Sequence, residues 1–111
     1  MIKTIALINR KPGLSMEEFV KHYEENHAPL ALKHFPTLKR YVRNYVVAMP
    51  GTEEPDFDCI TEFWFDDIEG AMAVQETLGD YKTEIGKIFL EDEEKFQDRG
   101  KTRSFLVDEK V

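Results

Sequence analysis

His27 belongs to a short stretch of sequence whose residue types can carry proton-transfer chemistry. It precedes Ala28-Pro29-Leu30, at a position where an amphipathic helix normally presents a plain hydrophobe. A buried imidazole must satisfy two ring nitrogens that a leucine would not have. Desolvation and the negative end of a helix act on it in opposite directions, so it can titrate near neutrality. His27 is therefore the candidate general acid or base, and the alternative is a core histidine bonded to a backbone carbonyl.

The helix that must position His27 is predicted to begin at Ser15, because Ser15 and Glu18 have the spacing of a capping box. At about 100° per residue, one face of this helix forms a stripe that is otherwise apolar. Its members are Met16, Phe19, Val20, Tyr23, His27 and Leu30. Pro29 has no N–H for the carbonyl of Glu25 and clashes with that turn. We therefore expect the helix to kink or end at His27.

The other two histidines carry less information. His22 lies at the polar edge of the same helix, where the simplest interpretation is a surface pair with Glu18, and His34 lies in the exit from the segment. His22 and His27 are about 140° apart around a helix, so they cannot easily share a metal as an i, i+4 pair can. The sequence shows neither a Cys/His cluster nor a phosphate-binding glycine loop. We therefore predict no metal and no cofactor.

The order of the remaining elements predicts the fold. Residues 2–8 are almost continuously apolar, which favours a central strand with both faces covered. The later elements are strands at 41–48 and 57–65, a helix from a cap at 66–67 to Gly79, a helical stretch at 81–96 and a strand at 102–107. This βαββαβ order is typical of an α+β, ferredoxin-like antiparallel sheet with its helices on one face. With 111 residues, we expect a single domain over residues 1–111.

The second face of that sheet needs a cover of its own. Side chains alternate along a strand, and both sets are apolar here, with Tyr41 beside Val42 and Phe63 beside Trp64. Helices cover only one of the two faces, so the other would expose an apolar patch of several hundred Å². The sequence therefore predicts a homodimer that forms through the sheet faces.

Charge and composition exclude several classes of partner. The formal net charge of −7 repels phosphate backbones and anionic lipid headgroups, so we expect neither nucleic acid nor a membrane as partner. The apolar residues 2–8 are too few for a signal peptide or a membrane span, which favours a cytoplasmic location. Cys59, the single cysteine, lies in an apolar run and is interpreted as a small buried hydrophobe.

Aromatic and amide side chains near the predicted helix and strands are candidate substrate-binding residues. Tyr23 or Tyr45 could hydrogen-bond a developing oxyanion, and Asn44 could orient a substrate. Phe19 and Trp64 could form the walls of a pocket for a flat hydrophobic ligand. The alternative for most of the aromatic residues is a place in the core, because a domain of this size needs that burial in order to fold.

The residues that carry a family resemblance extend through nearly the whole chain. They are Arg10 to Gly13, Ser15, Phe19, His27 to Leu30, Tyr41, Asn44, Phe63 to Asp66, Asp92 and Phe96. In these positions the sequence resembles the EthD family of the dimeric α+β barrel superfamily. The His-Ala-Pro-Leu element is the most specific part of the match. Tyr23 departs from the family pattern, since relatives often carry Trp there, and this change can reshape or polarise the pocket wall.

The resemblance implies a dimeric α+β barrel of ferredoxin-like subunits, each an EthD-like domain with a small cavity between sheet and helices, and a functional role for His27. Similar proteins include one encoded beside an ether-degrading oxygenase system and fungal polyketide decarboxylases or dehydratases. The first hypothesis is a cofactor-independent enzyme of the lyase, isomerase, decarboxylase or cyclase type, acting on a small hydrophobic cyclic, aromatic or polyketide-like compound. The alternatives are a non-catalytic protein that binds a hydrophobic ligand or assists an oxygenase or degradation system, and a cofactor-free monooxygenase.

Overall fold

A computed structural model describes residues 1–111, and its centre is a single four-stranded antiparallel sheet. Across the sheet the strands are β2 (Arg40–Tyr45), β3 (Cys59–Phe65), β1 (Ile2–Ile8) and β4 (Arg103–Asp108). The apolar first strand therefore lies inside the sheet, as predicted, between β3 and β4. Together with the βαββαβ order, this arrangement confirms the α+β, ferredoxin-like fold.

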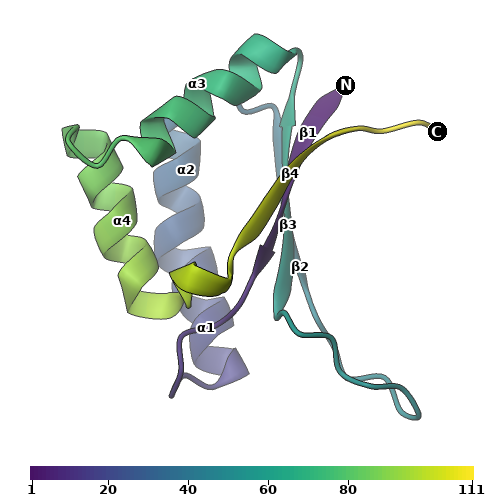
Figure 1. The fold of residues 1–111 in the computed structure, drawn as a ribbon. Helices are drawn as coiled ribbons and strands as arrows, with labels where there is room; N and C mark the ends of the chain where they lie inside the picture. The colour runs from purple at the N-terminus through teal and green to yellow at the C-terminus, as the bar shows by residue number, and fades with distance from the viewer.

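The helices all lie on one face of the sheet and leave the other face open (Figure 1). They are α1 (Met16–His22), α2 (Ala28–His34), α3 (Ile68–Gly79) and α4 (Glu84–Phe96), with a short 3₁₀ turn at Arg99–Lys101 before β4. None of these helices has the length and hydropathy needed to cross a bilayer. The side chains that could form a site are therefore held between one layer of helices and one layer of sheet.

Local signals in the sequence set most of the helix boundaries. The Ser15 hydroxyl accepts the Glu18 N–H at 3.1 Å and Glu18 accepts the Ser15 N–H at 3.1 Å, which confirms the capping box. Asp67 caps α3 through the Gly70 N–H. The last predicted helix begins at residue 84 instead of 81, because Thr83 supplies its N-cap.

The connection between β2 and β3 is longer than the sequence predicts. β2 ends at Tyr45 instead of residue 48, and β3 begins at Cys59 instead of residue 57. Residues 46–58 project past the ends of β2 and β3 as a long hairpin loop (Figure 1), in which Val47 is 83% exposed. The Pro, Gly and acidic residues of this segment do not suit a strand ladder, so pairing stops earlier than the flanking valines suggest.

The helical segment around His27 differs from one of the two predicted alternatives, a helix that ends at His27. The helix does not end at His27, because α1 leads into a π-helical turn at Tyr23–His27 and then into α2, which contains Pro29. In the π turn the Ala28 N–H donates to the Tyr23 carbonyl, five residues earlier. The proline follows this widened turn at the start of α2, where a missing N–H is tolerated.

The core lies between the helices and the helix-facing side of the sheet. One cluster surrounds Phe19, Tyr23 and Phe96, and a second surrounds Phe35 and Phe89. Cys59 is fully buried in the first cluster, and burial raises the pKa of its thiol to about 11. Its predicted role as a small buried hydrophobe is confirmed.

The open face of the sheet carries polar groups among its apolar side chains. Lys3 Nζ lies 2.8 Å from Glu62 Oε1 and 4.4 Å from the centre of the Trp64 ring. The Trp64 indole nitrogen is buried without a hydrogen-bond partner. Phe105 lies on the same face in β4 and remains 47% exposed. This face is therefore amphipathic, whereas the sequence pattern emphasised only its apolar residues.

Candidate active site

Asp92 connects two histidines of the first helical segment to α4. Its Oδ2 lies 2.8 Å from His27 Nδ1, and its Oδ1 lies 2.9 Å from His22 Nε2. The His27 and Asp92 side chains are only about a tenth exposed, at 9% and 10%. The interpretation of His22 as a surface partner of Glu18 is therefore wrong: Glu18 is used by the Ser15 cap, and His22 turns toward α4.

The charge of Asp92 determines which ring nitrogen of His27 carries the proton. Burial alone would raise the pKa of Asp92, but the hydrogen bonds from His27 and His22 outweigh it, and the pKa lies below its usual range. An ionised carboxylate only accepts hydrogen bonds, so the Nδ1 atom of His27 carries its proton. The Nε2 atom is consequently the unprotonated nitrogen of the neutral ring, and it is the one available to a ligand.

Local structure explains why these side chains meet. In α4 the buried residues Phe89, Asp92 and Phe96 follow one another at intervals of three and four, so they share one face of the helix. His22 stacks on Phe96 with ring centres 4.7 Å apart. In the sequence Asp92 stands out only through the family resemblance, and its contact with the two histidines is not predicted. The signal was a lone carboxylate on an otherwise apolar helical stripe.

A cavity of about 240 Å³ lies between the sheet and the helices, and His27 forms part of its wall. Aromatic side chains of Phe35, Tyr41, Phe63 and Phe89 supply much of its apolar surface. Helix α3 and strand β4 contribute polar groups to the wall, among them Gln75 and Ser104. The cavity therefore combines aromatic walls with several convergent polar groups, a combination found in many small-molecule sites.

A carboxylate of α4 other than Asp92 lines this cavity. Glu93 is part of the cavity wall together with His27 and Arg99, and its side chain is 19% exposed. Burial raises the pKa of Glu93, and the nearby His27 and Arg99 reduce this effect without reversing it. Arg99 Nε lies 3.9 Å from Glu93 Oε1, and the guanidinium also donates to the Tyr81 hydroxyl.

The comparisons with known proteins place this geometry in a family. The model of the EthD domain matches residues 11–100, which include the π turn, His27 and Asp92. The chain belongs to the EthD family. A search of curated protein sequences finds no match. This EthD chain is similar to the crystal structure of an ethyl tert-butyl ether D (EthD) family protein from Bacillus halodurans C-125, with 26% identity, 99% of each chain covered and a TM-score of 0.70.

Two more distant structures share the fold of the EthD chain. A dimeric protein of unknown function with a ferredoxin-like fold from Bacteroides fragilis has 9% identity and a TM-score of 0.62, with 97% of this chain and 95% of that chain covered. A mutant of SnoaB, a cofactor-independent oxygenase from Streptomyces nogalater, has 11% identity and a TM-score of 0.58, with 99% and 93% covered. At these identities the similarity concerns the fold alone.

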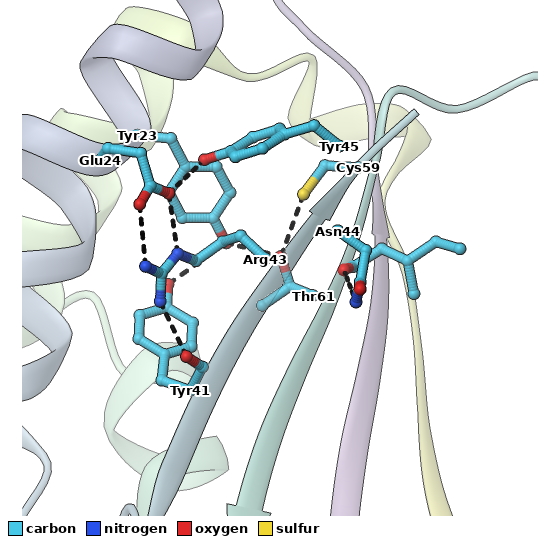
Figure 2. A network of polar contacts seen from close by, with 9 residues as sticks. Tyr23, Glu24, Tyr41, Arg43, Asn44, Tyr45, Cys59 and Thr61 are labelled. Atoms are coloured by element: carbon cyan, nitrogen blue, oxygen red, sulfur yellow. Dashed lines mark hydrogen bonds and ion pairs between the residues drawn. The ribbon is translucent and has the colours of Figure 1, made fainter. Parts of the chain in front are cut away.

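The tyrosines of the EthD chain take part in a separate network of polar contacts (Figure 2). Tyr23 lines the cavity, but its hydroxyl lies 2.8 Å from Thr61 Oγ1 and accepts a hydrogen bond from Tyr41 at 3.2 Å. Burial raises the pKa of Tyr23 well above its ordinary value. Tyr45 donates to Glu24, which also binds the Arg43 guanidinium through both oxygens. Both hydroxyls are therefore already engaged within the protein.

The remaining predicted substrate-binding residues do not line the cavity. Phe19 is fully buried in the core, 6.0 Å from Tyr23 between ring centres. Asn44 points away from the tyrosine network (Figure 2), and its amide donates to the Ile60 carbonyl and to Glu62. Trp64 lies on the open face beneath Lys3. The structure therefore brings only His27 and Tyr23 of the predicted set to the cavity wall.

No group of three or more His, Cys, Asp or Glu side chains in residues 1–111 has the arrangement needed to hold a metal ion. His22 and His27 converge on a carboxylate at hydrogen-bond distance, with one nitrogen from each ring. What the arrangement supplies is an oriented imidazole at the wall of an aromatic cavity. Such a group can move a proton to or from a bound molecule.

Proposed function

We propose that this EthD protein is a cofactor-independent enzyme that acts on a small hydrophobic cyclic, aromatic or polyketide-like compound by general acid and base catalysis. His27 is its proton-transfer residue, in a reaction of the lyase, isomerase, decarboxylase or cyclase type. The observation that carries the proposal is the position of His27, which borders the cavity while Asp92 holds its Nδ1 atom.

The Nε2 atom of His27 acts as the base in this mechanism. With the proton fixed on Nδ1, its lone pair accepts a proton from an activated C–H or a phenol of the bound substrate. Asp92 then lies 2.8 Å from a cationic imidazolium, which it stabilises by a charge-assisted hydrogen bond. Asp92 is thus a positioning residue that keeps one tautomer in place.

The dimensions and walls of the cavity support the choice of substrate class. A cavity of ~150 Å³ is sufficient for benzene, whereas this one has a volume of about 240 Å³. It therefore suits a compound of one or two rings. Phe89 packs with ring centres 5.6 Å from His27 and 4.8 Å from Phe35, so a flat ligand would meet aromatic surface beside the base.

A His27→Gln variant tests this proposal against His34→Gln, a matched change in a histidine outside the cavity wall. We expect His27→Gln to reduce turnover of a cyclic ketone, lactone or phenol by about 10² or more, with retained binding and fold. His34→Gln should keep the wild-type rate. If His27→Gln turns over the same compound as fast as the wild type, the proton-transfer role is wrong, and a binding or accessory function is favoured.

We also propose that two copies of the chain associate through their open sheet faces. The bare face in Figure 1, the half-exposed Phe105 and the exposed Val47 of the projecting loop support this assembly. The Bacteroides fragilis structure of similar fold is described as dimeric. Light scattering at micromolar concentration should give twice the chain mass of 13.0 kDa, and a strict monomer would disprove the assembly. The cytoplasmic location remains a prediction from the sequence.

A further inference from the structure

The cavity holds a second titratable group that the mechanism above does not use. Glu93 and His27 both form part of the wall of the same 240 Å³ space, and they come from different elements, α4 and the π turn. Asp92, the residue before Glu93, turns to the two histidines instead. A ring compound that fills this cavity can therefore contact His27 and Glu93 at the same time.

The surroundings of Glu93 differ from those of a structural ion pair. Arg99 Nε lies 3.9 Å from Glu93 Oε1, beyond hydrogen-bond distance, and the Nη2 atom of the same guanidinium donates to the Tyr81 hydroxyl. The carboxyl group is mostly buried, and no other side chain of the protein forms a hydrogen bond with it. A carboxyl at the cavity wall that is 19% exposed and has no hydrogen bond from another side chain is available to a ligand.

We propose that Glu93 is the acid partner of His27 and that the substrates are enolisable one- or two-ring ketones or lactones. This inference rests on the proposed function, because it assigns to Glu93 the proton that the substrate oxygen receives when His27 removes a proton from carbon. Arg99 borders the same part of the cavity and supplies positive charge close to that oxygen.

The step balances without any further reactant. The Nε2 lone pair of His27 takes a proton from the carbon beside the carbonyl, and the C–H electron pair becomes the C=C bond of an enol. The carbonyl π pair moves onto oxygen, which takes the proton of the Glu93 carboxyl. His27 becomes imidazolium and Glu93 becomes carboxylate. Return of the imidazolium proton to the same or another carbon, and of the enol proton to Glu93, restores the protein and completes an exchange or an isomerisation.

The charges around Glu93 favour this assignment. Burial raises the pKa of Glu93, so the neutral acid persists to higher pH than in an ordinary glutamic acid. His27 and Arg99 then face the carboxylate that proton transfer leaves behind, while Asp92 faces the imidazolium. Two carboxyl groups with pKa values shifted in opposite directions beside one imidazole are a pattern typical of acid and base pairs.

Proton exchange in D₂O tests the inference with α-tetralone and benzofuranone as probes, followed by the loss of the proton NMR signal beside the carbonyl. The variants are Glu93→Gln, which keeps the shape but has no transferable proton, and Glu94→Gln as the matched control at an exposed neighbour. His27→Gln reports on the proposed function in the same assay. We expect Glu94→Gln to exchange like the wild type, and Glu93→Gln and His27→Gln each to be slower by about 10²-fold, with unchanged half-saturation in Glu93→Gln.

The outcomes separate the two proposals. Wild-type exchange in Glu93→Gln with loss in His27→Gln overturns the role of Glu93 and leaves the proposed function intact. Wild-type exchange in both variants, or no exchange by the wild type above buffer, overturns both. Should Glu93→Gln fail to fold, the carbonyl carbon-13 signal of α-tetralone bound to the wild type decides. The reference is the same ligand bound to Glu94→Gln at higher pH, where Glu93 is ionised and cannot donate. A carbonyl signal of the wild-type complex that lies downfield of this reference supports hydrogen-bond donation by the acid, and an equal signal contradicts it.

Discussion

Asp92 and Glu93 are neighbours on α4 and are both mostly buried, yet their environments have opposite effects. Two imidazole nitrogens contact Asp92 at 2.8 and 2.9 Å, and its pKa lies below the usual range. Glu93 faces the cavity, where burial raises its pKa and the nearby His27 and Arg99 reduce this effect without reversing it. The contrast shows that the partners of a buried carboxylate, more than burial itself, decide which protonation state it holds.

Helix geometry produces this contrast from adjacent residues. A rotation of about 100° per residue directs consecutive side chains of α4 to different surroundings. Asp92 lies on the stripe that packs against the π turn, whereas Glu93 lies beside it, toward the cavity. One carboxylate can thus fix the tautomer of His27 while the next remains available to a ligand.

Replacing Asp92 with Asn should have the largest effect, because Asp92 is the acceptor for two imidazole N–H groups. We expect a loss of about 2–3 kcal/mol in the free energy of unfolding, since a hydrogen bond to a charged group contributes more than a neutral one. Urea denaturation measures this loss. Nitrogen-15 NMR should also show His27 losing its preference for the Nδ1–H tautomer. Glu91→Gln, at an exposed position of the same helix, is the control and should change neither quantity.

The dependence of stability on pH should have opposite sign for the two neighbours. The folded-state pKa of Asp92 is below its ordinary 3.8, so its contribution is complete above pH 4 and is lost as the pH falls through the folded value. The folded-state pKa of Glu93 is above its ordinary 4.5, so its contribution is complete below that value and is lost as the pH rises through the folded pKa.

Unfolding of the wild type, Asp92→Asn and Glu93→Gln between pH 3 and pH 8 measures both effects. The deficit of Asp92→Asn should shrink toward pH 3. Glu93→Gln should gain stability relative to the wild type as the pH rises above 5. Curves that run parallel for the two variants would contradict the contrast between the two carboxylates.

His22→Ala should have a smaller effect than the change at Asp92, because it removes one of two donors and leaves His27 in place. We expect a loss of about 1 kcal/mol, from one hydrogen bond and the stacking on Phe96. Nitrogen-15 NMR should still show the Nδ1–H tautomer of His27. A loss of that tautomer would mean that His22, and not Asp92 alone, orients the ring.

Glu24→Gln should have the smallest effect and extends the comparison to an exposed carboxylate. Glu24 binds Arg43 through both oxygens and accepts from Tyr45, but its side chain is 39% exposed. Exposed ion pairs contribute under about 1 kcal/mol and weaken with salt. Thermal unfolding in low and high salt should show a small difference that salt removes, and a larger loss than in Asp92→Asn would reverse the ranking.

The fold could be predicted from local patterns because the residues that define each element lie close together in the sequence. The Ser15 and Glu18 capping box, the apolar first strand and the cap at Asp67 all depend on residues within a few positions of one another. The strand ends near residues 46–58 could not be predicted, since β-propensity continues where pairing has already stopped. Pairing depends on the partner strand, which is distant in sequence.

The candidate site could be predicted only in part for the same reason. His27 stood out because its polarity conflicts with a helical stripe, a conflict visible in one segment. Its contact with Asp92 joins residues 65 positions apart, and no local pattern specifies it. Asn44 and Trp64 were assigned to the substrate from their types alone, and the register of β2 and β3 places them on the open face. A shift of one residue along a strand exchanges the two faces.

The π turn at Tyr23–His27 also has a meaning in terms of chain length. A turn closed by a five-residue hydrogen bond holds one residue more than an α-helical turn, so the segment from α1 to α2 contains a single-residue insertion relative to a continuous α-helix. Deleting Asn26 would remove this insertion and place Pro29 inside a continuous α-helix, where its ring clashes with the carbonyl four residues earlier. The extra residue thus makes room for the proline in the same segment that presents His27 to Asp92.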